Sequence, residues 1–329
     1  MQSESGDGDL DGLDLQLIDH LQIDGRIPYV ELARRLEVTE KTVRRRVSRL
    51  IDQGYVTIAA VTDPSLLGFG SMALALVTVD GSRSPVELAD ELAQLPETDY
   101  VTVTTGPFAV QVELICTDPR ELHDVAFGKI RTTPGVAAVE LLPYLRLHYQ
   151  QARFSGVRGD RDGVRPRQLD ETDRAIISRL AVDGRAAFRD FAAALGVSET
   201  TIRFRYTRLV ESGAVRVMCI VNPLRLGYRW SSWVTIRVDG HGSARDVAEA
   251  LTGLQPVSYV ALTSGRWDVL AEVVTDSGEA LLSVLDDDIR AIEGVAALES
   301  WSYIALHYKA VRPRRTDGLA GHDNDIQIV

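Results

Sequence analysis

The sequence predicts an α+β protein that contains two copies of one unit, each a winged or helix-turn-helix domain followed by a ferredoxin-like βαββαβ domain. Three observations predict it: an internal repeat, a three-helix apolar pattern opening each copy, and alternating strand-like and helix-like runs after it. The chain has 329 residues, which corresponds to two or three domains at about 100–200 residues each. Hydrophobic residues make up 45% of it and charged residues 25%, as in ordinary globular proteins with buried cores.

The repeat runs along almost the whole chain at the constant spacing that separates Leu10 from Leu169. Asp24-Gly25-Arg26 recurs as Asp183-Gly184-Arg185, and His148-Tyr149 recurs as His307-Tyr308. A repeat this long indicates a duplicated pair of domains and not a solenoid. We therefore expect helix-turn-helix domains over 10–62 and 169–221, ferredoxin-like effector domains over 63–150 and 222–310, a linker over 151–168, and disordered tails over 1–9 and 311–329.

The first part of each copy has the pattern of a helix-turn-helix domain. In copy one, apolar positions predict helices over 14–21 and 29–36, followed by a third helix that Thr39 caps. Copy two repeats the pattern, with Ser198 as the cap of its third helix.

The second part of each copy alternates between strand and helix patterns. In copy one we expect strands over 72–79, 100–105, 110–117 and 136–148, and helices over 85–95 and 122–130. This order gives an open antiparallel sheet with helices on one face. The other face needs a partner, so we expect the effector domains to pair through their sheets. The pairing can join the two copies of one chain as a pseudo-dimer, or it can join chains into a homo-oligomer.

The third helix of copy one carries five cations in a protein whose net charge is −11 and whose pI is about 5.1. If Val43, Val47 and Leu50 face inward, Lys41 and Arg44 face outward, together with Arg45 and Ser48. Such a helix fits the major groove of double-stranded DNA, where Arg and Lys bind guanine edges or phosphates. The alternative is a solvated basic face. The expected DNA contacts are Thr39, Lys41, Thr42, Arg44, Arg45, Arg46 and Arg49 in copy one, and Ser198, Thr200, Thr201, Arg203, Arg205 and Arg208 in copy two.

Two ambiguities remain within these predicted helices. Arg46 and its counterpart Arg205 lie beside the inward stripe, so each either forms an ion pair with the first helix or contacts a phosphate. In copy two, Thr200 replaces Lys41 and Phe204 replaces Arg45, which weakens the basic face. Phe204 either touches a thymine methyl group or marks a helix that packs on protein.

Both copies resemble the Lrp/AsnC (feast/famine) family of transcriptional regulators. In copy one the residues that carry the resemblance are Leu10-Asp11, Asp14, Asp24-Gly25-Arg26, Leu32-Ala33, Arg46, Arg49, Leu50, Gly54, Asp63-Pro64 and Leu67-Gly68. The usual member carries one reader and one effector domain, so this chain resembles a fused tandem form. The resemblance implies sequence-specific DNA binding, an effector that is a small molecule such as an amino acid, and pairing through the effector sheets.

The resemblance also places the effector near the turn after the second effector strand, which typically reads Gly-x-x-Asp. Copy two keeps this pattern, whereas copy one has Ala109 in place of the aspartate and a proline after its glycine. Freed backbone N–H groups would hold a carboxylate, and Asp268 would pair with an ammonium group, unless it only stabilises the turn. The expected effector-binding residues are Thr263, Ser264, Gly265, Trp267 and Asp268 in copy two, and Thr105, Gly106 and Phe108 in copy one.

Other function classes are disfavoured by the sequence. Cys116 and Cys219 are too few for a disulfide framework or a cysteine metal site, and we expect both to be buried free thiols. No apolar run is long enough to span a membrane and no signal peptide opens the chain, so we expect a cytoplasmic protein. We expect no catalytic residues, metal or cofactor, because no catalytic or metal-binding spacing is present.

Two rival functions share this architecture. Sirohaem decarboxylases have the same two-domain plan, but they typically carry histidines near the glycine turn, and the corresponding stretches here have none. The other rival is a ligand-sensing scaffold whose reader domains no longer bind DNA.

Overall fold

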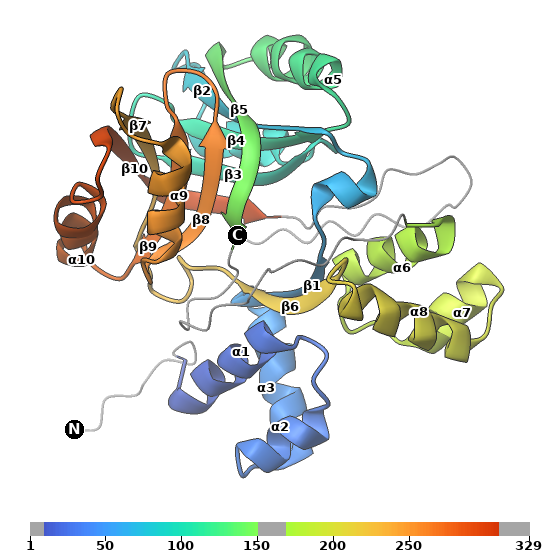
Figure 1. Ribbon diagram of the computed structural model, residues 1–329. Helices are drawn as coiled ribbons and strands as arrows, with labels where there is room; N and C mark the ends of the chain where they lie inside the picture. The colour runs from blue at the N-terminus through green and yellow to red at the C-terminus, as the bar shows by residue number, and fades with distance from the viewer. Residues whose placement is uncertain (1–9, 151–168, 309–329) are drawn as a thin grey trace, which may run out of the picture.

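The computed structural model describes residues 10–150 and 169–308, so the expected tails and linker lie outside the described residues. Two three-helix units lie beside a single large β-barrel, and a two-stranded ribbon lies between them (Figure 1). The predicted α+β class with tandem units is confirmed. No helix within 10–150 or 169–308 is long and apolar enough to cross a membrane.

The helical units follow the predicted patterns. The first contains α1 (Gly12–Ile23), α2 (Tyr29–Arg35) and α3 (Glu40–Asp52), and the second contains α6 (Glu171–Val182), α7 (Phe188–Leu195) and α8 (Glu199–Glu211). Thr39 caps α3 by accepting a hydrogen bond from the backbone N–H of Thr42, as predicted. Val43, Val47 and Leu50 are fully buried, which confirms the inward stripe.

A strand follows each helical unit, and the sequence indicated only the second of them, through the strand-like apolar run around Cys219. Strand β1 (Val56–Val61) pairs antiparallel with β6 (Arg216–Val221) of the other copy. The ribbon and both helical units share one apolar core, in which Leu17, Val47 and Ile176 are fully buried. A six-residue strand is stable here only because its partner comes from the other copy, and one copy's sequence gives no sign of that partner.

The effector units have the predicted βαββαβ order. In copy one the elements after η1 (Pro64–Leu67) are β2 (Ser71–Val79), α4 (Pro85–Leu92), β3 (Thr98–Thr104), β4 (Val110–Cys116), α5 (Pro119–His123), η2 (Asp124–Lys129), η3 (Ile130–Thr132) and β5 (Val136–Gln150). In copy two they are β7 (Trp230–Val238), α9 (Ala244–Thr252), β8 (Val257–Thr263), β9 (Val269–Thr275), α10 (Gly278–Ser283), η4 (Val284–Ile289) and β10 (Val295–Tyr308). The second helix of each unit continues as a π-helix, η2 or η4, which the apolar period did not predict.

The two sheets are not open, which corrects the prediction of stacked open sheets. Strand β5 pairs with β2 of its own copy and then with β8 of the other, and β10 pairs with β7 and then with β3. The result is a closed barrel of eight strands within one chain. The physical reason is length: β5 has 15 residues and β10 has 14, against nine in β2 and β7, so each last strand extends beyond its own sheet. Closure removes the exposed sheet edges.

The barrel separates three apolar cores. The first packs between copy one's strands and helices, with Leu88 and Val112 buried, and the second repeats it in copy two. The third fills the barrel interior between the copies and contains Leu74, Trp233 and Trp301. Cys116 and Cys219 are both buried and free, as predicted.

Candidate functional site

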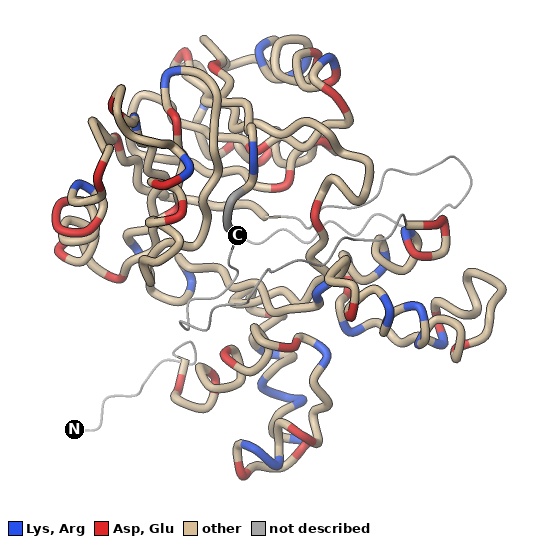
Figure 2. Tube along the Cα trace, viewed as in Figure 1, with Lys and Arg blue, Asp and Glu red and all other residues tan. Residues whose placement is uncertain are grey.

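The outward face of α3 is basic and exposed. Lys41, Arg44 and Arg45 are all exposed, and among the residues that the structure describes Arg44 pairs with Glu40 of the same helix, at 2.8 Å. Figure 2 shows Lys and Arg together with Asp and Glu on the helices of both reader units and around the barrel, so the basic face of α3 is a local feature. The overall negative charge of the chain therefore coexists with a local cationic ridge on α3.

Arg46 and Arg49 have structural partners on α1. The Arg46 Nη1 atom lies 2.7 Å from a carboxylate oxygen of Asp11 and 3.0 Å from one of Asp14, and Arg49 also hydrogen-bonds Asp14. The Asp14 side chain is only 1% exposed, so these guanidinium groups neutralise a buried carboxylate. The hydrogen bond from Arg46 lowers the pKa of Asp11.

Arg205 repeats this arrangement in copy two, at 2.6 Å from Asp170 and 2.8 Å from Asp173. Of the two alternatives for Arg46 and Arg205, the structure shows the ion pair with the first helix. These two residues, together with Arg49, are therefore distinct from the exposed cations Lys41, Arg44 and Arg45.

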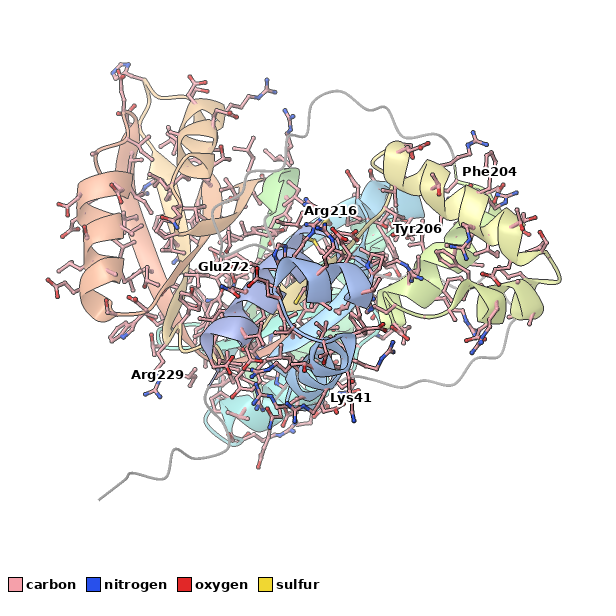
Figure 3. The ribbon with its side chains drawn as sticks, turned by 90° about the horizontal axis from the view of Figure 1, so that it is seen from below. Lys41, Phe204, Tyr206, Arg216, Arg229 and Glu272 are labelled. Atoms are coloured by element: carbon pink, nitrogen blue, oxygen red, sulfur yellow. The ribbon has the colours of Figure 1, made fainter. Side chains whose placement is uncertain are left out.

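The second recognition helix, α8, presents a different face. Arg203 and Arg208 are exposed, and Phe204 between them is 61% exposed, so most of its side chain faces solvent. The Arg208 guanidinium lies 5.6 Å from the Phe204 ring centroid. Figure 3 shows Lys41 of α3 and Phe204 of α8 at the outside of their units. The two recognition helices therefore expose different chemistry at equivalent positions.

The first turn of each recognition helix is hydroxyl-rich. Thr39 and Thr42 hydrogen-bond each other at 2.9 Å, and Ser198 and Thr201 do so at 2.8 Å. Thr39, Ser198 and Thr200 are exposed, and Thr42 and Thr201 are partly exposed. Hydroxyls and backbone N–H groups at a helix N-terminus are a suitable site for a phosphate oxygen.

The two reader units interlock through the repeated Asp-Gly-Arg segments, a feature that the sequence analysis did not identify. The Arg26 guanidinium donates to the carbonyl oxygens of Gly184 (2.5 Å) and Ala186 (3.1 Å). Reciprocally, Arg185 donates to the carbonyl oxygens of Gly25 (2.6 Å) and Ile27 (3.1 Å). The sequence feature that could have indicated this contact is the recurrence of the Asp-Gly-Arg motif in both copies, in a loop that has no apolar pattern.

The glycines in these segments permit the close approach. The Gly25 N–H donates to the Val217 carbonyl oxygen at 2.9 Å, and a Cβ added at Gly25 would lie 2.9 Å from the Met218 backbone. The Gly184 N–H donates to the Ile58 carbonyl oxygen at 2.8 Å. Any side chain at these positions would push each loop away from the other copy's strand. The interlock therefore fixes the relative position of α3 and α8.

The glycine turn of copy one is covered by the other copy. A Cβ added at Gly106 would lie only 2.6 Å from the Trp301 Cδ1 atom, and the Phe108 ring meets the Trp301 indole edge-on at 5.4 Å. The Thr105 N–H donates to the Ser302 carbonyl oxygen at 2.9 Å. The turn therefore has both its glycine face and one backbone donor occupied.

The glycine turn of copy two is more open. The nearest atom to a Cβ added at Gly265 would be Leu142 Cδ2 at 3.5 Å, which is an ordinary contact. Leu142 is the copy-one counterpart of Trp301, so a leucine and not an indole faces this glycine. The Ser264 N–H donates to the Pro143 carbonyl oxygen at 2.8 Å. Ser264 and Gly265 are exposed, whereas Thr263 is buried.

Asp268 stabilises the turn in this structure. Its carboxylate accepts a hydrogen bond from the Val238 N–H at 2.8 Å, and Trp267 beside it is buried. The exposed cation of this turn is Arg266, which the sequence analysis did not select. Its guanidinium lies 5.6 Å from the Phe108 ring and 5.8 Å from the Trp267 ring. Two carboxylates also approach it, Glu140 at 3.4 Å and Glu299 at 3.9 Å.

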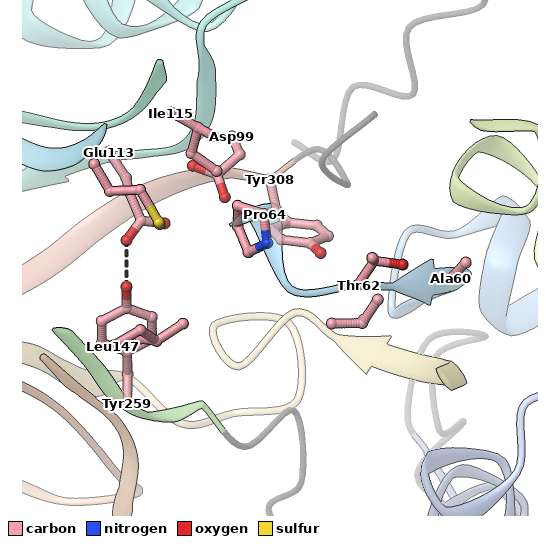
Figure 4. Close-up of a pocket in the computed structure, with 11 residues that line it drawn as sticks. Ala60, Thr62, Pro64, Asp99, Glu113, Ile115, Leu147, Tyr259 and Tyr308 are labelled. Carbon is pink, nitrogen blue, oxygen red and sulfur yellow. Dashed lines mark hydrogen bonds between the residues drawn. The ribbon is translucent and has the colours of Figure 1, made fainter. Parts of the chain in front are cut away.

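The barrel interior contains two buried glutamates that the sequence analysis did not select, Glu113 and Glu272. Glu113 accepts hydrogen bonds from the hydroxyls of Tyr259 (2.6 Å, Figure 4) and Tyr144 (2.9 Å). Its repeat counterpart Glu272 accepts them from Tyr100 (2.7 Å) and Tyr303 (2.9 Å). Each glutamate thus binds one tyrosine of its own copy and one of the other. The sequence feature that could have indicated these groups is a glutamate at the same position of the two apolar strands β4 and β9.

A metal centre finds no support in the described chain, where no group of three or more His, Cys, Asp or Glu side chains could hold an ion.

Comparisons with known proteins identify the domains. The model of the AsnC-type helix-turn-helix domain matches residues 10–51 and 169–210, and that of the Lrp/AsnC ligand binding domain matches 72–153 and 231–308. An uncharacterized HTH-type transcriptional regulator of Pyrococcus furiosus is 32% identical over 133 residues, which cover 40% of this chain and 89% of that protein. The HTH-type transcriptional regulator FL11 of Pyrococcus abyssi is 36% identical over 140 residues, covering 42% of this chain and 91% of that protein.

One similar solved structure spans both copies. The siroheme decarboxylase NirDL superposes with a TM-score of 0.60 at 18% identity, over 92% of this chain and 93% of that chain. At this level of identity the likeness is one of fold.

Proposed function

The chain is a tandem member of the Lrp/AsnC family of DNA-binding transcriptional regulators, and we propose that one chain binds one operator through two unlike half-sites. The observation that carries this proposal is the reciprocal hydrogen bonding of Arg26 and Arg185 to the backbone of the other reader unit. In single-copy regulators, two chains are needed to bring two recognition helices together. Here the ribbon, the interlock and the barrel do so within one chain.

The proposed DNA contacts differ between the two readers. Lys41, Arg44 and Arg45 of α3 supply cations for guanine edges and phosphates. On α8, Arg203 and Arg208 flank Phe204, whose exposed ring offers an apolar contact for a thymine methyl group. The capping hydroxyls of Thr39 and Ser198 position each helix against a phosphate. Because the two faces differ, we expect half-sites of different sequence.

We further propose that the effector is a small amino acid bound at the Gly265 turn and not at the Gly106 turn. Trp301 covers Gly106, whereas Gly265 and Arg266 are exposed. Arg266 would bind the ligand's carboxylate, and Glu140 and Glu299, which now approach Arg266, would bind its ammonium group. Asp268 keeps its hydrogen bond to the strand β7 backbone and positions the turn.

Operator binding is tested by footprinting and by the mass of the complex. The protein is titrated onto its own upstream region, and the protein–DNA complex is sized by analytical ultracentrifugation. We expect one chain to protect a site with two dissimilar halves. A strictly symmetric footprint, or a minimal complex with two chains per site, would reject the single-chain arrangement.

Decarboxylation of sirohaem is the second candidate, because the NirDL fold likeness extends over both copies. The stretches 100–110 and 259–269 around the two turns contain no histidine to act as an acid, which favours regulation over catalysis. Incubation with sirohaem is expected to leave it unchanged, whereas a gel shift on the upstream region is expected to succeed. Failure of the gel shift together with ligand binding would favour a sensing scaffold. We propose that the protein acts in the cytoplasm, where a bound operator would be found.

A further inference from the structure

We propose that Tyr29 and Phe188 are positioning residues for DNA recognition, because each ring contacts a DNA-facing arginine of its own reader unit and the interlocking arginine of the other. Tyr29 begins α2 and Phe188 begins α7, and the two residues occupy the same repeat position. The inference rests on the proposed DNA contacts of α3 and α8. It adds that a residue of one copy sets the arginine that reads the other copy's half-site.

Two guanidinium groups lie over the Tyr29 ring. The Arg185 Cζ atom lies 4.0 Å from the ring centroid, and the Arg44 Cζ atom lies 5.3 Å from it. Both distances are within the ~6 Å at which a cation is attracted to the face of an aromatic ring. Arg185 comes from the Asp-Gly-Arg loop of copy two, whereas Arg44 belongs to α3. The ring therefore connects the interlock to the recognition helix of copy one.

Phe188 repeats this arrangement with the copies exchanged. The Arg26 Cζ atom lies 4.3 Å from its ring centroid, and the Arg203 Cζ atom lies 5.4 Å from it. The Tyr206 ring also lies 5.4 Å from Arg26, and Figure 3 shows Tyr206 on the side of α8 toward the first reader unit. Because the three-residue contact recurs at equivalent positions of both copies, it follows from the fold of the readers and not from a chance approach of surface side chains.

The interlocking arginines are fixed without DNA. Arg26 and Arg185 are partly buried, and each donates to two backbone carbonyl oxygens of the other copy's loop. A guanidinium group whose N–H groups are already bonded has a fixed plane, on which an aromatic ring can stack. Each ring is therefore held in place from the side of the other copy.

The recognition arginines remain accessible to DNA. The side chains of Arg44 and Arg203 are 64% and 63% exposed. Each also pairs with a glutamate one turn earlier on its helix, Arg44 with Glu40 at 2.8 Å and Arg203 with Glu199 at 2.7 Å. A long side chain loses rotamer freedom when it binds, and contacts that fix it in advance reduce that cost. The two rings would therefore raise the affinity of their own recognition helices.

The line of contacts crosses between the copies. Arg185 of copy two acts on Arg44 of α3 through Tyr29, and the reciprocal line runs from Arg26 of copy one to α8. Loss of Arg185 should therefore weaken the half-site that α3 reads, although Arg185 belongs to the other copy. A residue that only stabilised the fold would weaken both half-sites alike.

The test measures each half-site by itself. The operator is located by footprinting on the upstream region, and the half lost in Lys41→Ala is assigned to α3. Two duplexes, each with the other half scrambled, are then titrated by fluorescence anisotropy. We expect Arg185→Gln to bind the duplex with the α3 half about threefold or more weakly, and to bind the other duplex within about twofold of the wild type. Arg26→Gln should give the opposite pattern.

Variants of the ring test the stacking directly. Tyr29→Leu keeps an apolar side chain but loses the ring, so it should weaken the α3 half as Arg185→Gln does. Tyr29→Phe keeps the ring and should restore wild-type binding. Arg189→Gln is the matched control in copy two, because Arg189 follows Phe188 but pairs with Asp190 at the surface. It should leave the α3 half unchanged.

A measurement without DNA separates this proposal from the proposed function. In the free, arginine-labelled protein, the ring current should shift the Nε–H signals of Arg44 and Arg185 upfield. Tyr29→Leu should remove this shift and leave the signal of Arg45, on the same helix, unchanged. If two chains bind each site, the single-chain arrangement fails, whereas the signals of the free chain still decide the stacking. Arg185→Gln supplies the result for Arg44 where Tyr29→Leu does not fold, as its melting temperature shows.

Four results would overturn the proposal. Arg185→Gln could weaken both single-half duplexes equally, or Tyr29→Leu could bind both as the wild type does. Tyr29→Phe could bind as weakly as Tyr29→Leu, which would make the hydroxyl and not the ring responsible. Finally, the Arg44 signal could be the same in Tyr29→Leu as in the wild type.

Discussion

Trp301 in the last strand of copy two lies directly on Gly106 in the glycine turn of copy one, so that a Cβ at Gly106 would lie 2.6 Å from the indole Cδ1 atom. The repeat counterpart of Trp301 is Leu142, which leaves 3.5 Å above Gly265. Among the differences between the two equivalent strands, the one at Leu142 and Trp301 therefore distinguishes a covered turn from an open one.

This contact predicts a stability effect that depends on the indole. Gly106→Ala should lower the free energy of unfolding by about 1–3 kcal/mol, because the new methyl group overpacks a filled interior. In the background of Trp301→Leu, the same change should cost clearly less, because leucine leaves room for it. Denaturant unfolding of the four proteins in a double-mutant cycle measures this coupling. Additive costs would show that the indole is not what occupies the turn.

The exposed cations of α3 should dominate DNA binding. Replacing Arg44 and Arg45 by alanine should weaken operator binding more than replacing Arg203 and Arg208, because α3 has Lys41 and Arg45 where α8 has Thr200 and Phe204 and so supplies more of the charge for phosphate binding. Gel-shift titrations at several salt concentrations measure both the affinity and its salt dependence. Each lost phosphate contact should reduce the slope of log K against log salt by about 0.9. Equal losses for the two double variants would contradict the predicted division of labour.

The interlock should set the spacing between half-sites. Arg26→Ala removes hydrogen bonds to the carbonyls of Gly184 and Ala186, so the reader units should become free to move relative to each other. We expect weaker binding to the native operator, but a smaller penalty when base pairs are inserted between the half-sites. Arg34→Ala, which loses only a local pair with Glu31, is the matched control. An unchanged spacing preference for Arg26→Ala would mean that the ribbon alone holds the readers.

The Gly265 turn should respond to its two charged residues in different ways. Arg266→Ala should abolish stabilisation by an amino-acid effector, because Arg266 is the proposed carboxylate partner, while leaving the unliganded melting temperature nearly unchanged. Asp268→Ala should lower the unliganded melting temperature, because the Val238 N–H loses its acceptor. A thermal-shift screen over the common amino acids separates these effects. Retained stabilisation in Arg266→Ala would refute the assignment of Arg266.

Glu113 should make stability depend on pH. Burial raises the pKa of its carboxyl, the nearby Glu272 raises it further, and hydrogen bonds from Tyr259, Asp99 and Tyr144 only partly offset this. A carboxyl with a raised pKa in the folded state binds more protons folded than unfolded. Its contribution is therefore fully present below its ordinary pKa of 4.5 and is lost as the pH rises through the raised value.

Glu113→Gln removes this titration. The wild-type protein should lose stability relative to the variant as the pH rises above about 4.5, the ordinary pKa of glutamate. Urea unfolding at a series of pH values measures the difference between the two proteins. A difference that does not change with pH would show that Glu113 keeps one protonation state throughout.

Much of the fold followed from local patterns. The stripe of Val43, Val47 and Leu50, the cap at Thr39 and the exposed face with Lys41 and Arg44 are consequences of the helical period and of capping chemistry. The strand-like apolar runs between helical patterns likewise placed the effector strands within a few residues. These properties depend on neighbours in the sequence, so one copy contains all the information they need.

The arrangement of the candidate sites depended on contacts between the copies. Pairing of β5 with β8, the docking of Arg26 on Gly184 and the covering of Gly106 by Trp301 all join residues far apart in the chain. The same holds for Arg46, whose choice between phosphate and Asp14 is decided by the packing of α3 on α1.

The amino-acid sequence alone thus determined the units, their duplication and the cationic character of α3, because periodicity and motif chemistry are local. Only the tertiary structure decided that the duplicates close into one barrel, which turn stays open, and where buried carboxyl groups meet. These outcomes depend on which surfaces of two similar units face each other, and that choice is a balance of packing and desolvation over the whole molecule.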